Sequence, residues 1–357
     1  MAIPFSSPGD STSLKNLRLL ISAIPKAELH LHLEGSIEPA TAVELAARHG
    51  VAISEEEVRE RYAPGDFAKF LEGFKWVTSF LQAPDDYALI TERLAEQLLA
   101  QNVVYAEVTL SIGVMLLRKQ DPLANFAAIR AAAKNYESRG LRMQFIFDAV
   151  RQFGARAAEE VVSLASQCVP EGVTAFGIGG DELALPAKDF VRVYERAGAA
   201  GLGRLIHAGE IGNASAIQEA VAILGVTRVG HGIAAMNDSR VMDFLAQRGI
   251  TLELCPTSNI RTGALARQLG KSSARIEEHP LKLFFDRGIL VALSTDDPAM
   301  FETTLLSEYA LAARTMGMQA DALVRVAEMG FENSFLSVET KARYLKSLRA
   351  AFPSPSG

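Results

Sequence analysis

The chain has 357 residues, of which 49% are hydrophobic, and a formal net charge of -6 at pH 7. This length suits one α/β barrel, which needs about 250 residues, and the absence of a basic stripe argues against a nucleic-acid partner. No apolar stretch reaches the roughly 20 residues that span a bilayer, and the polar N-terminus lacks the form of a signal peptide. The two cysteines, Cys168 and Cys255, suit a reducing compartment. We therefore expect a cytoplasmic protein with no membrane partner.

In chain order, residues 1–24 are predicted to form an N-terminal extension with a helix, residues 25–350 a single domain, and residues 351–357 a disordered tail. Eight short apolar runs are typical of strands buried on both faces: 27–33, 103–110, 143–150, 173–178, 204–207, 228–233, 250–254 and 289–293. Amphipathic helices are predicted between several of them, at 83–101, 123–139, 155–166 and 187–200. This alternation predicts an α/β fold, the (β/α)8 TIM barrel.

The interval between the first and second predicted strands is longer than a crossover needs. It contains three further helical patterns, at 39–50, 55–62 and 67–81. We expect these extra helices to lie near the mouth of the barrel.

Ionisable side chains gather at the predicted strand ends, where barrel enzymes place their chemistry. The residues concerned are His30 and His32 on strand one, His207 on strand five, His231 on strand six, and Asp296 and Asp297 after strand eight. Each has an ordinary alternative explanation, such as a hydrogen-bonded core histidine or a turn before proline. Their coincidence at four strand ends favours a metal site, because buried ionisable groups are costly unless they are paired or bound to metal. Residues i and i+2 of a strand share a face, so His30 and His32 can bind the same metal ion.

Several nitrogen ligands with one carboxylate suit a single zinc ion and leave a position for water. Zinc lowers the pKa of that water to about 7, which supplies a nucleophile at neutral pH. Other divalent ions could occupy the same ligands. The sequence therefore predicts a metal-dependent hydrolase.

A set of motifs, taken in order, resembles the adenosine deaminase family of the amidohydrolase superfamily. They are PKAELHLHLEGSI (25–37), FLEGF (70–74), VVYAEV (103–108), GGDE (179–182), HAGE (207–210), VGHG (229–232), ELCPTSN (253–259) and STDDP (294–298). The resemblance covers essentially the whole barrel. It implies a zinc-dependent hydrolase that removes ammonia from a small 6-aminopurine compound.

The resemblance also implies a role for each site residue. Zinc is expected on His30, His32, His207 and Asp296. Catalysis is expected from His231, which orients or deprotonates the water, from Asp297, which is hydrogen-bonded to it, and from Glu210, which protonates the purine N1. The backbone N–H of Gly180 is expected to meet the purine. This chemistry is coherent, because attack at C6 pushes negative charge onto N1 and a nearby carboxylic acid offsets that charge.

Some positions depart from the pattern of adenosine enzymes. Glu34 stands where those enzymes have an aspartate on the ribose 5′-hydroxyl, and Arg151 follows strand three, where it could pair with a substrate carboxylate or form a rim salt bridge. The segment FGIGGDE lacks the bulkier residues that usually precede the acidic pair. From these differences we expect the substrate to be adenosine or a 5′-modified adenosine such as aminodeoxyfutalosine, with free adenine as the second candidate.

An apolar stripe at helical spacing consists of Phe67, Phe70, Leu71 and Phe74. A stripe of this kind is ordinarily helix core, but the resemblance implies a hydrophobic entrance over the substrate. Two other functions fit the sequence less well. A cyclic-amide amidohydrolase would commonly need a bridging lysine at the end of strand four, where this chain has GGDE, and a non-catalytic binding protein would be expected to lose a ligand or the acid. His49 and His279 receive no role, and the oligomeric state stays open.

Overall fold

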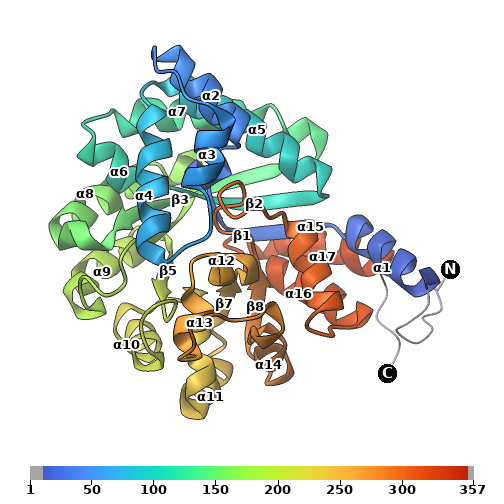
Figure 1. Cartoon of the computed structure of the whole chain (residues 1–357). Helices are drawn as coiled ribbons and strands as arrows, with labels where there is room; N and C mark the ends of the chain where they lie inside the picture. The colour runs from blue at the N-terminus through green and yellow to red at the C-terminus, as the bar shows by residue number, and fades with distance from the viewer. Residues whose placement is uncertain (1–10, 353–357) are drawn as a thin grey trace.

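The computed structural model of the protein describes residues 11–352. Its centre is a barrel of eight parallel strands, each paired with the next in chain order (Figure 1). Their bounds are β1 Lys26–His32, β2 Val103–Leu110, β3 Arg142–Val150, β4 Val173–Gly179, β5 Gly203–Ala208, β6 Arg228–His231, β7 Thr251–Leu254 and β8 Leu290–Leu293. The predicted (β/α)8 barrel is confirmed, and each predicted strand overlaps an observed one.

Two contacts between neighbouring strands of the barrel contain fewer paired residues than the others. β8 meets β1 through a bridge between Leu31 and Asp296, in which Asp296 N donates to His30 O over 3.0 Å and His32 N donates to Asp296 O over 2.8 Å. The same contacts that close the barrel therefore place Asp296 beside the two histidines of β1. β4 and β5 pair at two positions near the start of β5, Ala175 with Gly203 and Phe176 with Arg204.

Helices surround the strands as predicted (Figure 1). The outer helices include α5 Pro84–Ala100, α7 Pro122–Lys134, α8 Gly154–Gln167, α9 Val191–Ala199, α10 Ala214–Leu224, α11 Ser239–Arg248, α14 Leu281–Asp286 and α16 Ala320–Glu332. Shorter or peripheral helices are α1 Ser11–Ala23, α6 Ile112–Leu117, α12 Pro256–Arg261, α13 Ala264–Gln268, α15 Leu305–Arg314 and α17 Val338–Ala351. The predicted helices 123–139 and 187–200 are each divided between an α-helix and a 3-10 turn, Glu137–Arg139 and Ala187–Phe190.

The extra helices between β1 and β2 are α2 Pro39–Arg48, α3 Glu55–Arg61 and α4 Phe67–Val77. Side chains cap two of them: Ser54 accepts from Glu57 N at the start of α3, and Asp66 accepts from Lys69 N at the start of α4. Such caps satisfy backbone N–H groups that a helix leaves free at its first turn.

Both ends of the chain are helical where they are described. α1 packs against α15 and α16, and α17 continues to Ala351. Ala351, the first residue of the predicted tail, is thus the last residue of α17, and residues 353–357, like residues 1–10, lie outside the described residues. Within residues 11–352, no helix has both the length and the apolar character needed to cross a membrane.

Candidate active site

Four histidines and an aspartate meet at the carboxyl ends of the strands. The ring centre of His30 is 5.3 Å from that of His32, 4.6 Å from that of His207 and 5.0 Å from that of His231. Nε2 of His30 and Nε2 of His32 each lie 3.3 Å from Oδ1 of Asp296. Two groups of possible metal ligands share Asp296, and within each group the ligand atoms lie within 4.8 Å of one another. One group contains His30, His207, His231 and Asp296, and the other contains His32, Asp296 and Asp297. This donor set fits a divalent cation.

His30 is held by a carboxylate on its far side. Its Nδ1 is 2.7 Å from Oε2 of Glu253 on β7, and the other oxygen of Glu253 accepts from Nε of Arg228 over 2.5 Å. A carboxylate on the second ring nitrogen fixes the tautomer and the orientation of a metal-binding histidine. Nε2 of His30 is buried and, among the described residues, has no hydrogen-bond partner. A buried atom left in this state is explained by a cation in the cluster.

The protonation of the cluster also suits a cation. Burial lowers the pKa of His32 to about 4, and burial together with the neighbouring histidines lowers the pKa of His207 well below its usual value. Neutral imidazole is the form that binds metal. For His30, burial opposes the charge, but the neighbouring carboxylates of Asp296 and Glu253 outweigh it and raise the pKa to about 10. A bound cation would replace that proton.

Two site residues adopt the left-handed backbone conformation although they are not glycine. His231 has φ 59° and Asp296 has φ 69°. Such conformations cost about 1–3 kcal/mol and persist where the surroundings impose them, most often at functional sites. At Asp296 the surroundings are the bridge to β1 and the hydroxyl of Ser258, which donates to Oδ2 over 2.7 Å.

Asp297 packs against the backbone of the first motif. A Cβ at Gly35 would lie 1.8 Å from Oδ1 of Asp297, so the glycine of HLEG is required by this contact. Burial and the neighbouring Asp296 raise the pKa of Asp297 well above its usual value. Within residues 11–352, nothing hydrogen-bonds its buried Oδ1. Asp297 lies in a group of possible ligands with His32 and Asp296.

Glu210 lies beside His231, with Oε2 3.6 Å from Nε2 of the histidine. Burial, reinforced by the nearby carboxylates of Asp296 and Glu182, raises the pKa of Glu210 well above its usual value. A carboxyl group that keeps its proton at neutral pH can act as a general acid.

The loop that carries Glu210 is fixed by Glu182 of the GGDE motif. Its carboxylate accepts from four successive backbone N–H groups, those of Gly209, Glu210, Ile211 and Gly212, over 2.5 to 3.2 Å. A Cβ at Gly212 would lie 2.4 Å from Oε1 of Glu182. Glu182 thus connects the loops after β4 and β5, a role that the sequence analysis missed.

Two further buried carboxyl groups face the site. Oε1 of Glu34 accepts from Ser111 N over 3.0 Å, and Oδ2 of Asp148 accepts from Gly179 N over 3.2 Å. Burial raises the pKa of Glu34 to about 7 and that of Asp148 to about 8. The second oxygen of each has no hydrogen-bond partner among the described residues. Asp148 was missed, although an aspartate inside the apolar run of β3 was a usable signal.

Arg151 lies in a different environment from the one predicted. Its guanidinium is buried and donates to three backbone carbonyls, those of Glu182, Leu185 and His207, over 3.4, 3.3 and 2.6 Å. These bonds tie the end of β3 to the loops after β4 and β5. Both terminal nitrogens donate to backbone oxygens, so Arg151 holds the backbone at His207, and it forms no ion pair within residues 11–352. The predicted contact with a substrate carboxylate stays a prediction.

Gly180 adopts φ 88°, and a Cβ there would lie 2.5 Å from Oε1 of Gln152. The side chain of Gln152 also accepts from Asp181 N over 2.9 Å. The position therefore requires glycine for its backbone conformation and for close packing.

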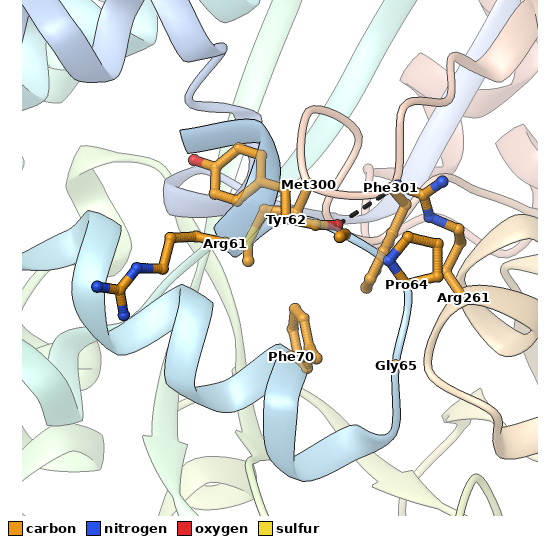
Figure 2. A pocket seen from close by; sticks show the side chains of 9 residues that line it. Arg61, Tyr62, Pro64, Gly65, Phe70, Arg261, Met300 and Phe301 are labelled. Atoms are coloured by element: carbon orange, nitrogen blue, oxygen red, sulfur yellow. Dashed lines mark hydrogen bonds between the residues drawn. The ribbon is translucent and has the colours of Figure 1, made fainter. Parts of the chain in front are cut away.

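The predicted apolar entrance is one face of α4. Phe67, Phe70, Leu71 and Phe74 are all half-buried. The ring of Phe70 lies 5.1 Å from that of Phe301, which follows STDDP. Figure 2 shows Phe70 pointing from α4 into a small pocket opposite Met300 and Phe301, with Tyr62 and Arg261 also on its wall. The stripe thus contacts the loop that carries Asp296 and Asp297.

Comparison with known proteins agrees with this geometry. The family model for adenosine deaminase matches residues 25–351. An aminodeoxyfutalosine deaminase from Streptomyces avermitilis is 37% identical over 94% of this chain and 93% of its own length. An adenine deaminase from Chelativorans is 33% identical over 91% of this chain and 98% of its own length.

Solved structures are similar over almost the whole chain. The adenine deaminase from Arthrobacter aurescens superposes with a TM-score of 0.85 at 29% identity, covering 92% of this chain and 99% of that structure. An amidohydrolase from Burkholderia ambifaria, solved with bound zinc, gives 0.86 at 25% identity, covering 98% and 96%. The predicted hydrolase acting on C–N bonds is confirmed at the level of the family. This chain belongs to the adenosine deaminase family.

Proposed function

We propose that this protein is a zinc-dependent hydrolase that removes the 6-amino group of a purine compound as ammonia. The cluster of His30, His207, His231 and Asp296, whose ligand atoms lie within 4.8 Å of one another, carries the proposal. His30, His32, His207 and Asp296 would hold one zinc ion, which when bound supplies a water nucleophile at neutral pH. The zinc bound to the Burkholderia neighbour supports this choice of metal.

The other site residues have complementary tasks in this reaction. Glu210, protonated because it is buried, would donate a proton to N1 of the purine as attack at C6 pushes electrons onto the ring. Asp297 would hold the attacking water through its free oxygen, and His231 lies close enough to both Glu210 and Asp296 to orient the reacting oxygen. The group that accepts the proton of the attacking water would pass it to the amino group, so that the C6–N bond breaks and the amino group leaves as ammonia.

For the substrate, we infer a 5′-modified adenosine of the aminodeoxyfutalosine type. Aminodeoxyfutalosine deaminases from two Streptomyces species are 37% identical to this chain over more than nine-tenths of it. Glu34, with one free buried oxygen, stands where a ribose hydroxyl could donate a hydrogen bond. The half-buried stripe of α4 offers an apolar wall to the rest of the molecule.

Free adenine is the second candidate. Adenine deaminases from several bacteria are 31–33% identical to this chain, and the Arthrobacter enzyme shares its fold at 29% identity. A cyclic amide is disfavoured, because β4 ends at Gly179 and is followed by Gly180 rather than a metal-bridging lysine.

The test is release of ammonia from adenosine, adenine, methylthioadenosine and aminodeoxyfutalosine, measured side by side with the zinc-loaded protein. We expect the highest kcat/KM with aminodeoxyfutalosine. A preference for adenine would favour the second candidate, and no release from any of the four would contradict the proposal. The Glu210→Gln variant serves as the control, because it keeps the shape of the side chain and removes the acidic proton.

A further inference from the structure

His279 is buried behind the active site and is connected to it through one side chain. It lies just before α14, and its Nε2 is 3.1 Å from Oδ1 of Asn259 in α12. The other end of that amide, Nδ2, is 3.1 Å from Nδ1 of His231. All three side chains are buried. They form a continuous hydrogen-bonded chain from the helical layer to His231, and we call it the His279–Asn259–His231 relay.

The backbone fixes the direction of this relay at its outer end. The N–H of Leu281 donates to Nδ1 of His279 over 3.2 Å. A backbone N–H can only donate, so Nδ1 of His279 accepts and bears no proton. An imidazole that lacks a proton on one nitrogen bears it on the other. His279 therefore donates from Nε2 to Oδ1 of Asn259.

The amide of Asn259 transmits this direction to the active site. Because its oxygen accepts from His279, its NH2 group faces His231, and an NH2 group can only donate. Nδ1 of His231 therefore accepts a hydrogen bond and bears no proton. The ring must then bear its proton on Nε2, the nitrogen that lies 3.6 Å from Glu210 Oε2 and 3.8 Å from Asp296 Oδ2.

We propose that His279 and Asn259 are positioning residues that hold His231 in the tautomer with its proton on Nε2. A nitrogen that bears a proton has no lone pair for a metal ion. The relay thus removes His231 from the possible ligands, although it lies in the cluster with His30, His207 and Asp296. This agrees with the proposed set, in which His32 is the fourth ligand.

The relay also selects one of two roles for His231 in catalysis, a consequence that rests on the proposed deamination. With its proton on Nε2, His231 donates a hydrogen bond to the attacking oxygen and does not remove a proton from it. Acceptance of that proton would then fall to the carboxyl group of Asp297 once a bound cation has displaced its proton, because burial and the neighbouring Asp296 raise its pKa in the metal-free protein.

The sharpest test reverses the direction of the hydrogen bond between residue 259 and His231 without changing the shape of the side chain. In Asn259→Asp, both carboxylate oxygens accept hydrogen bonds, so His231 must donate from Nδ1. We would record ¹⁵N spectra of the histidines in the full-length, zinc-loaded protein, with His231 assigned by comparison with His231→Gln. In the wild type we expect Nε2 of His231 protonated and Nδ1 unprotonated, and in Asn259→Asp we expect Nδ1 protonated.

The same variant should lower kcat about 100-fold or more, with a smaller change in KM, because a misplaced proton removes a donor from the transition state. His279→Gln, which can still donate to Asn259, should retain the wild-type tautomer and most of the activity, whereas His279→Leu should lose both. A wild-type spectrum with Nδ1 of His231 protonated would overturn the proposal even if every variant failed to fold. So would unchanged His231 signals in Asn259→Asp. The spectrum needs no substrate, so failure of the relay is distinguishable from failure of the proposed deamination.

Discussion

The two ends of the barrel differ in whether their buried polar groups are hydrogen-bonded. At the amino end, Arg228 donates to Glu107 and Glu253 and to the carbonyls of Leu29 and Asn333. Glu107 also accepts from the hydroxyl of Tyr105 and from Phe335 N. At the carboxyl end, buried atoms of His30, Glu34, Asp148 and Asp297 have no hydrogen-bond partner among the described residues.

This difference distinguishes buried groups that stabilise the fold from buried groups that are available to a ligand. A buried ionic network is tolerable when every charge is hydrogen-bonded, as it is around Arg228. Unsatisfied buried groups destabilise a fold and are explained where a ligand completes them. Glu253 belongs to both ends, because one of its oxygens holds Arg228 and the other holds His30. The satisfied network thus orients the first residue of the proposed metal site.

The largest expected effect falls on activity at the carboxyl end. Glu210→Gln removes the proposed acidic proton, so we expect kcat to fall about 10²–10⁴-fold. The free energy of unfolding should stay the same or rise, because a buried titratable group is lost. Ammonia release and urea denaturation of the same preparation measure the two quantities. Near-normal turnover would remove Glu210 from the mechanism.

The amino end should show the converse pattern. Arg228→Met leaves Glu107 and Glu253 buried without their counter-charge, so we expect a loss of about 3–5 kcal/mol in the free energy of unfolding. Arg59→Met is the matched control, because the Arg59–Glu55 pair is exposed and should contribute about 1 kcal/mol or less. The urea denaturation midpoints of the two variants compare their losses in the free energy of unfolding. Equal losses would show that the network is no more important than a surface pair.

The barrel and the cluster of His30, His207, His231 and Asp296 could be predicted from the sequence, because both depend on local patterns and strand order. Alternation on one strand places His30 and His32 on the same side, and strand order places His207 and Asp296 at the same rim. The supporting residues could not be found in this way. Glu253, Glu182 and His279 act through partners distant in the sequence, and those contacts arise only from tertiary packing.

Arg151 shows what a local pattern leaves open. An arginine just after a strand end predicts a substrate contact or a rim salt bridge, because the sequence shows its charge but not its direction. In the structure the guanidinium turns inward to three backbone carbonyls, including that of His207. Its role depends on how the loops after β4 and β5 pack, which no local pattern encodes.

A smaller effect should appear in the pH dependence of stability. Burial raises the pKa of Asp148 to about 8, whereas in the unfolded chain an aspartate titrates near its usual value of about 4. Between these values the folded state holds one more proton, so this group makes stability fall by about 1.4 kcal/mol per pH unit as pH rises. Asp148→Asn should remove that contribution. Urea denaturation from pH 5 to pH 7 on metal-stripped protein measures the slope, and an unchanged slope would contradict the assignment.

The smallest expected effect concerns the apolar entrance. Phe70→Ala removes a half-buried ring that packs on Phe301, so we expect KM for a 5′-modified adenosine to rise several-fold. The kcat should change little, because Phe70 touches none of the proposed catalytic groups. Steady-state kinetics with adenine as the smaller substrate provides the comparison. An equal rise in KM for adenine would show that the entrance does not recognise the 5′ substituent.

The central claim is that the unpartnered groups at the carboxyl end surround one zinc ion. Anomalous diffraction on either side of the zinc absorption edge, from crystals of the zinc-loaded protein, tests it most directly. We predict a single anomalous peak contacted by His30, His32, His207 and Asp296, with His231 beside it but not bound to it. No peak at this position, two peaks, or a zinc ion ligated by His231 in place of His32 would contradict the account.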